Sequence, residues 1–129
     1  SKYIGYHDRH VSAKRDAEIM MTCVRLIEKI QTEFYNMEYM DYQETKFHWD
    51  DCKDIPNHKE LRIEYLGDNL DDYFNKYRLI HKQVLKIEKP VYNTHNRNGL
   101  AMNIAHINHN RARKLLFKIL EDNIERWWD

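Results

Sequence analysis

The sequence is poor in the residues that crosslink a chain or turn it sharply. Its 129 residues include only two cysteines, three glycines and two prolines. Cys23 and Cys52 cannot form a disulfide framework, which favours a reduced, intracellular protein. The scattered glycines leave no phosphate-cradling loop and no nucleophile elbow. The commonest nucleotide-binding loops and the small disulfide-rich secreted folds are therefore excluded.

Long apolar runs are also missing. No run approaches the roughly 18 residues that a membrane-spanning helix needs. The N-terminal segment SKYIGYHDRH has no apolar core of the kind found in signal peptides. We therefore expect a cytoplasmic protein that does not associate with membranes. The bias toward Phe, Tyr, Met, Ile, Asn and Lys is typical of AT-rich genomes and suggests a phage or viral origin.

No charge of one sign dominates, because 21 Lys and Arg balance 21 Asp and Glu. The charges are unevenly spread: residues 38–72 carry 4 basic and 11 acidic side chains, whereas residues 73–129 carry 11 and 5. The two regions are expected to complement each other within the fold or across a dimer. Nucleic-acid binding is disfavoured, since it normally requires a clear basic excess.

Apolar residues recur at helical spacing in three segments. The first contains Ile19, Met20, Cys23, Ile27, Ile30, Phe34 and Met37. Their spacings of three and four predict a helix over about residues 12–45. A second helix, over about residues 69–88, is predicted to open at the acidic segment GDNLDD and to end before Pro90. The third, over about residues 99–127, has a stripe of Ile104, Ala105, Ala112, Leu115, Leu116, Ile119 and Trp127.

The segment between the first two predicted helices loses this periodicity. From Lys46 to Asn69 its acidic turn-forming residues predict a long irregular connection. Within it, LRIEYL alternates apolar and polar residues, which indicates a short strand that would need a partner such as KPVYN to form a β-hairpin. The predicted fold class is therefore all-α: a single helical domain over residues 1–129, built as a three-helix bundle, with a four-helix bundle as the alternative.

Each predicted helix also carries polar residues on its apolar face. Projection along the helix axes places six of them on or beside the apolar stripes: Asp16, His81, His106, Asn108, His109 and Arg113. Asp41 takes a similar inward position, one turn beyond Met37. Because an isolated buried charge costs several kcal/mol, these side chains are expected to have partners.

Three interpretations of these six residues remain open. They can form a satisfied polar network that fixes the helix register. They can instead form a candidate polar pocket, in which Asp16 orients His109 and Arg113 holds an anionic substrate. The third interpretation is a metal site, but neither Glu-x-x-His nor His-Glu-x-x-His occurs, so no metal ligand is predicted. The sequence leaves any cofactor unknown.

The C-terminal segment IERWWD suggests an interface. Trp127 and Trp128 are adjacent and cannot both face one core, so one is expected to meet a partner or to pack under the N-terminal segment KYIGY. The predicted function is that of a small intracellular interaction or regulatory protein, binding a protein partner or a second copy. The alternative is a helical enzyme or anion-binding protein that uses the candidate polar pocket.

Overall fold

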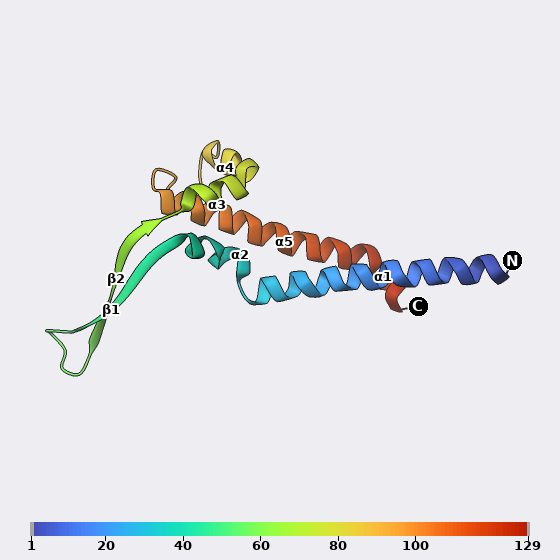
Figure 1. The fold of residues 1–129 in the computed structure, drawn as a ribbon, viewed down its shortest axis with the longest axis horizontal. Coiled ribbons are helices and arrows are strands. Elements are labelled where there is room, and N and C mark those ends of the chain that lie inside the picture. Colours follow the sequence, from blue (N-terminus) through green and yellow to red (C-terminus); the bar gives the residue numbers. More distant parts are fainter. Residues whose placement is uncertain (1, 129) are drawn as a thin grey trace. The chain divides into compact units, whose positions relative to one another are not determined.

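The fold combines helices with a small antiparallel sheet. The structure is a computed structural model that describes the backbone of residues 2–128 and the side chains of residues 11–127. In chain order its elements (Figure 1) are α1 (Lys2–Gln31), α2 (Phe34–Met37), the 3-10 helix η1 (Glu38–Tyr42), β1 (Gln43–Asp51), β2 (Lys59–Asp68), α3 (Leu70–Lys76), α4 (Arg78–Leu85) and α5 (Arg97–Trp128). None of the helices in this part of the chain has the length and apolar character needed to cross a bilayer.

The all-α prediction is wrong, because residues 43–51 and 59–68 pair as antiparallel strands. The helix predicted over residues 12–45 ends at Gln31, and the rest of that segment forms α2, η1 and β1. Glu33 follows the helix end with a left-handed φ of 56°, and its amide donates to the Ile30 carbonyl at 3.2 Å. The helix thus stops in a left-handed residue without the glycine that usually marks such an end.

The second predicted helix is interrupted, whereas the third lies close to its predicted bounds. Residues 69–88 do not form one helix, because Tyr77 leaves helical geometry with φ −114° and ψ 46° and separates α3 from α4. α5 begins and ends within two residues of the predicted bounds. LRIEYL does lie in a strand, β2, but its partner is β1 rather than KPVYN. The KPVYN segment is fixed differently, since the backbone of Tyr92 bonds to the Asn103 side chain.

Backbone contacts divide the chain into two compact units. Unit 1 joins Ser1–Tyr35 to Ile107–Asp129, and unit 2 is the continuous segment Asn36–His106. α5 contributes residues to both. That the chain forms a single domain remains a prediction.

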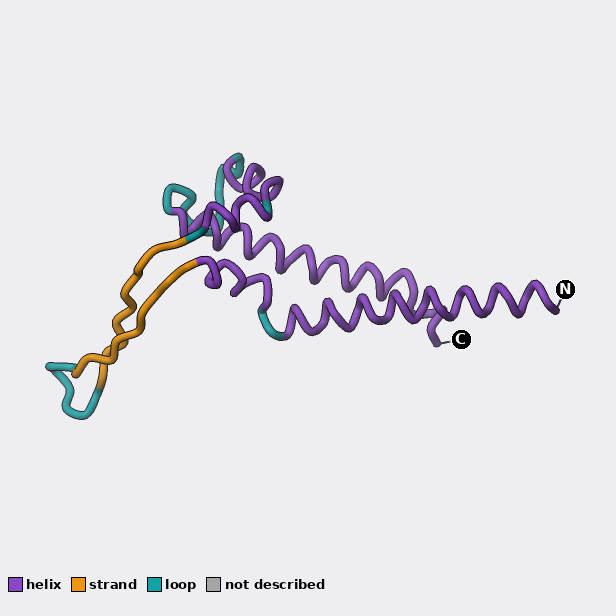
Figure 2. Tube along the Cα trace, in the orientation of Figure 1, coloured by secondary structure: helices purple, strands orange, loops and turns teal. Residues whose placement is uncertain are grey.

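Unit 1 is an antiparallel pair made by α1 and the later turns of α5, which run side by side in Figure 2. Its buried apolar residues are Cys23, Leu26, Ala112 and Leu116, with Ile30, Tyr35, Ile119, Leu120 and Trp127 packed against them. Asp16 forms an ion pair with Arg126 at 2.6 Å toward one end of the seam, and Nδ1 of His109 lies 3.9 Å from the Glu33 carboxylate toward the other end. The seam is narrow, since two of its four buried apolar residues are the small side chains Cys23 and Ala112.

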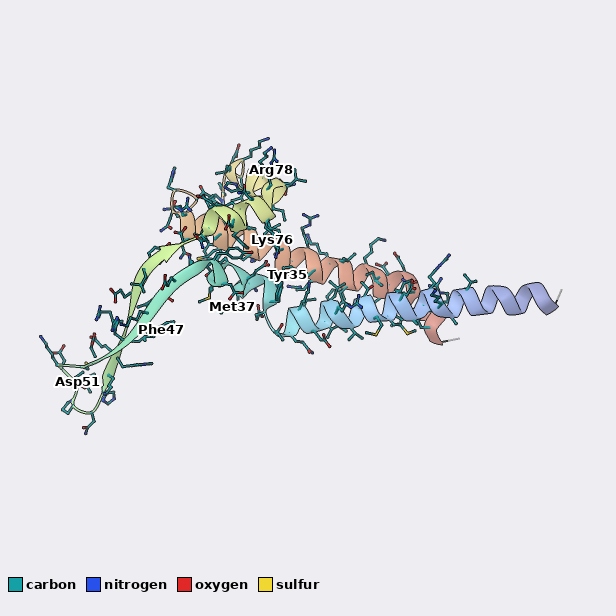
Figure 3. The ribbon with its side chains drawn as sticks, in the orientation of Figure 1. Tyr35, Met37, Phe47, Asp51, Lys76 and Arg78 are labelled. Carbon is teal, nitrogen blue, oxygen red and sulfur yellow. The ribbon has the colours of Figure 1, made fainter. Side chains whose placement is uncertain are left out.

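Unit 2 has an aromatic core. Its buried apolar residues come from α3, α4 and the first turns of α5: Leu70, Tyr73, Phe74, Ile80, Val84, Ala101, Ile104 and Ala105. The Tyr73 ring lies 5.4 Å from Tyr42 and 5.2 Å from Tyr77. Tyr77 and Lys76 both donate hydrogen bonds to the buried carboxylate of Glu38; Figure 3 labels Lys76. These contacts tie η1 to α3 and fix the base from which the strands emerge.

The burial of Cys23 leads to a first prediction. Burial raises the pKa of the Cys23 thiol, whereas Cys52 is only half-buried. Because the thiolate is the reactive form, we expect an aromatic disulfide reagent to modify Cys52 more than about tenfold faster than Cys23. The rates are measured on the single variants Cys23→Ser and Cys52→Ser. Equal rates would show that the seam of unit 1 opens freely.

Candidate functional site

The β1–β2 hairpin separates its side chains cleanly by chemistry. Residues directly opposite in an antiparallel pair share one face of the sheet. The pairs Thr45 with Tyr65, Phe47 with Ile63 and Trp49 with Leu61 place apolar side chains on one face. The alternating pairs, which form the other face, are Lys46 with Glu64, His48 with Arg62 and Asp50 with Glu60. One face is therefore apolar and the other is charged.

The charged face is held by ion pairs, while the apolar face is open. His48 lies 2.7 Å from Glu64, and Arg62 donates to Asp50 at 3.0 Å. The five large apolar residues, which we call the hairpin face, are Phe47, Trp49, Leu61, Ile63 and Tyr65. They remain between 47 and 63 % exposed. Figure 3 labels Phe47 midway along β1, where the hairpin extends beyond α3 and η1. Exposed apolar residues gathered on one face make the hairpin face the candidate interaction surface of unit 2.

A bulge at the base of the hairpin sets its register. The pairing shifts between Glu44, which lies opposite Gly67, and Thr45, which lies opposite Tyr65, so that Leu66 is the extra residue. Gly67 has φ 148°, a value that side-chain-bearing residues rarely adopt. Because a one-residue slip would exchange the two faces, this bulge is what keeps the aromatic residues on a single side.

Asp68 anchors the base of the hairpin to the start of α5. Its carboxylate accepts hydrogen bonds from the Tyr65 hydroxyl, from Arg97 at 2.9 Å and from the Leu70 amide at 3.1 Å. The Tyr65 bond first, and Arg97 second, lower the pKa of Asp68 to about 2. Arg97 also donates to Asp71 at 3.1 Å. Two carboxylates thus neutralise this guanidinium.

Acid is expected to loosen this anchor. Because the folded-state pKa of Asp68 lies below its ordinary value of 3.8, the stabilisation is complete above that value and is lost as the pH falls from about 4 to about 2. We expect Asp68→Asn to flatten this part of the pH–stability curve. Tyr65→Phe, which removes the strongest of the hydrogen bonds, should reduce its slope. Urea unfolding between pH 2 and 6 measures both effects, and parallel curves for wild type and Asp68→Asn would contradict the assignment.

The loop before α5 is built from asparagines. Asn93 accepts from the His95 amide at 3.0 Å, and Asn96 caps α5 by accepting from the Asn98 amide at 2.8 Å. With Tyr65, Asp68, Arg97 and Asn98, this loop lines an open cleft of about 600 Å³. The cleft offers polar groups, but Arg97 is already paired with acids, so it is a poor anion site.

The six residues of the candidate polar pocket have contacts of their own. In unit 1, Asp16 pairs with Arg126 and His109 lies near Glu33, so the contacts of both lead outside the set. Asn108 is buried, and its Nδ2 atom has no hydrogen-bond partner among the described residues. Arg113 is exposed.

The two remaining histidines of that pocket belong to unit 2. His81 stacks on Phe74, with ring centroids 4.5 Å apart. His106 lines a separate cleft of about 160 Å³ with Asn36, Tyr39 and Tyr92. Asp41, the further inward acid of the sequence prediction, is exposed. In the described part of the chain, no three His, Cys, Asp or Glu side chains form a group that could hold a metal ion.

No protein-family model matches the chain, and no curated protein or solved structure is significantly similar to it. The function of the chain is therefore inferred from the side chains that it exposes. Sequence reasoning missed the hairpin face, although Thr45, Phe47 and Trp49 alternate with charged residues and give a strand signal. Of the two tryptophans predicted at an interface, Trp127 packs half-buried against the core of unit 1. The side chain of Trp128 lies outside the described residues.

Proposed function

We propose that this chain is a protein-interaction module that binds a protein partner through the hairpin face. The observation that carries the proposal is the exposure of five large apolar side chains on one side of a two-stranded sheet. Aromatic anchors such as Trp49 and Tyr65 supply much of the binding energy at protein interfaces. A two-stranded hairpin is also only marginally stable alone, so a surface that covers its apolar face would stabilise it.

The hairpin face is well ordered for binding. The ladder is continuous beyond the bulge, and the ion pairs His48–Glu64 and Arg62–Asp50 cross-link the opposite face. Asp68 and Arg97 fix the base. Binding to a preorganised surface loses less conformational entropy than binding to a mobile one.

Charge indicates the kind of partner. Residues 43–68 carry 7 acidic and 4 basic side chains. Such a ribbon repels the phosphates of nucleic acid. Like-charge contacts at an interface are costly, so the favoured partner presents an apolar groove bordered by Lys and Arg. We therefore assign the hairpin face to a protein with a basic rim.

Site-specific photo-crosslinking tests this assignment. A photoreactive phenylalanine analogue replaces Phe47 on the hairpin face or, as the control, its neighbour Lys46 on the charged face. We expect position 47 to crosslink a protein peptide rich in apolar and basic residues, at a yield at least about tenfold above position 46. Trp49→Ser should lower the yield at position 47 by a similar factor.

Three results would contradict the proposal. Equal yields at positions 46 and 47 would show that the faces do not differ in binding. A crosslink to a peptide of this same chain would assign the hairpin face to a second copy rather than to a foreign partner. A crosslink to nucleic acid would show that the acidic charge of the hairpin does not repel phosphates.

A further inference from the structure

Unit 1 has a second apolar surface beside its seam. On α1, Met20, Val24 and Ile27 are spaced by four and three residues; on α5, Phe117, Leu120, Ile124 and Trp127 follow the same rhythm. Such spacings place side chains on one face of a helix. The most exposed members, which are Met20, Val24, Ile27, Phe117 and Ile124, keep between 37 and 61 % of their surface open. We call these seven residues the flank stripe.

Both halves of the flank stripe lie on the same side of the helix pair. The most exposed members follow seam positions by one residue: Val24 follows Cys23, Ile27 follows Leu26, and Phe117 follows Leu116. Leu120 and Trp127 lie between the two surfaces, because they also pack against the seam. In an antiparallel pair, the residues that directly follow the seam positions lie on the same side of both helices. The reason is that the two chains run in opposite directions, so successive residues turn away from the contact in opposite directions as well. The two apolar rows therefore form one surface.

The opposite side of the pair is polar. The residues that precede the seam positions are Arg15, Glu18, Thr22, Arg25 and Lys29 on α1, and Arg111, Leu115, Lys118, Asp122 and Glu125 on α5. Only Leu115 among them is apolar, whereas the residues that follow the same ten positions are all apolar except Gln31 and Arg113. Solvation alone does not produce this difference between two flanks of the same helices, whereas a neighbour on one flank does.

We propose that the flank stripe is the docking site for a second copy of this chain. Two stripes related by a two-fold axis would bring together four helices, each using two adjacent apolar rows as helices in bundles do. Self-pairing fits the charge of unit 1, whose 11 basic and 9 acidic residues nearly cancel. Foreign partners are usually selected by a charge difference that unit 1 lacks.

The surface is large enough for a specific, modest interface. Five half-open large side chains, Leu120, Trp127 and the stems of flanking charged residues offer several hundred Å² per copy. The smaller specific interfaces bury about 600 Å² on each partner. Pairing would also complete the core of unit 1, which is narrow because Cys23 and Ala112 are small. The inference is independent of the hairpin face and its partner.

Sedimentation velocity of the full chain tests the proposal. We expect wild type to pass from monomer to dimer as its concentration rises, and Phe117→Ser to raise the dissociation constant at least about tenfold. The matched control is Leu115→Ser, two residues away on the same helix and 50 % exposed, against 61 % for Phe117. Leu115→Ser should dimerise like wild type, and so should Trp49→Ser on the hairpin face.

If the Phe117→Ser chain fails to fold, the thermal midpoint of the wild type tests the proposal instead. If dimerisation is coupled to stability, the thermal midpoint of wild type rises with protein concentration. A wild type that sediments as a monomer with a constant midpoint would overturn the proposal. Equal weakening by Leu115→Ser would also overturn it, because the polar flank would then contribute as much. Weakening by Trp49→Ser would assign the contact to the hairpin face instead.

Discussion

Replacing Gly99 with alanine is expected to lower the free energy of unfolding of unit 2 by about 3 kcal/mol. A Cβ atom at this position would overlap the Asn93 carbonyl oxygen and lie 3.0 Å from its carbonyl carbon. Both are backbone atoms and cannot rotate away. The loop cannot easily retreat either, because Asn103 bonds to the Tyr92 backbone and to the Gly99 carbonyl.

The sign of this effect makes it a sharp test. Gly99 lies in the first turn of α5, where helix propensity alone predicts that alanine would stabilise by about 1 kcal/mol. Urea unfolding followed by circular dichroism separates the two outcomes. Asn103→Ala offers a comparison, since it leaves Gly99 in place but removes the bonds that hold the loop. If Gly99→Ala is stabilising, the close approach of the loop to α5 is refuted.

Replacing Tyr73 with alanine is expected to cost about 3–5 kcal/mol, because it empties the centre of unit 2. Tyr73 has no exposed surface. Its ring contacts those of Tyr42, Phe74 and Tyr77, which belong to η1, α3 and the break before α4. Domains of this size have only about 5–15 kcal/mol of stability, so unit 2 should lose most of its folded population on mild heating.

Two variants show which part of Tyr73 matters. Tyr73→Phe keeps the ring and should cost less than half as much as alanine. Leu79→Ala removes an apolar side chain from the same unit, but Leu79 is 74 % exposed and its loss should cost less than about 0.5 kcal/mol. Thermal denaturation of the three variants gives the comparison. Equal costs for Leu79→Ala and Tyr73→Ala would mean that α3 does not form the core.

Helical periodicity predicted the long elements but not where they break. α5 follows its predicted bounds because Pro90 and an asparagine-rich turn precede it. α1 stops where the sequence gives no signal, since Glu33 takes a left-handed conformation that glycine or asparagine normally adopts. Tyr77 interrupts the second helix for tertiary reasons, its hydroxyl bonding to Glu38, thirty-nine residues earlier in the chain. Long-range contacts of this kind are not visible in a local pattern.

Local sequence patterns also did not predict which residues form the candidate surfaces. Helical spacing predicts one face for the apolar residues of the first helix, whereas Cys23 and Ile30 lie in the seam and Met20 and Ile27 in the flank stripe. Helical spacing alone does not separate two stripes about 100° apart. The candidate polar pocket combines residues that are predicted to face inward on three helices. Asp16 instead meets Arg126, a residue near the end of α5 that the projection did not consider.

The division of the chain into units also sets an order of assembly. Unit 2 is continuous, so its hairpin and short helices can form as soon as residues 36–106 leave the ribosome. Unit 1 must wait for residues from Ile107 on, and bringing Arg126 to Asp16 closes almost the whole chain into a loop, which is slower than closing a hairpin. Until then Cys23, Leu26 and Ile30 face water. α1 is therefore the element that waits longest during synthesis for its packing partner.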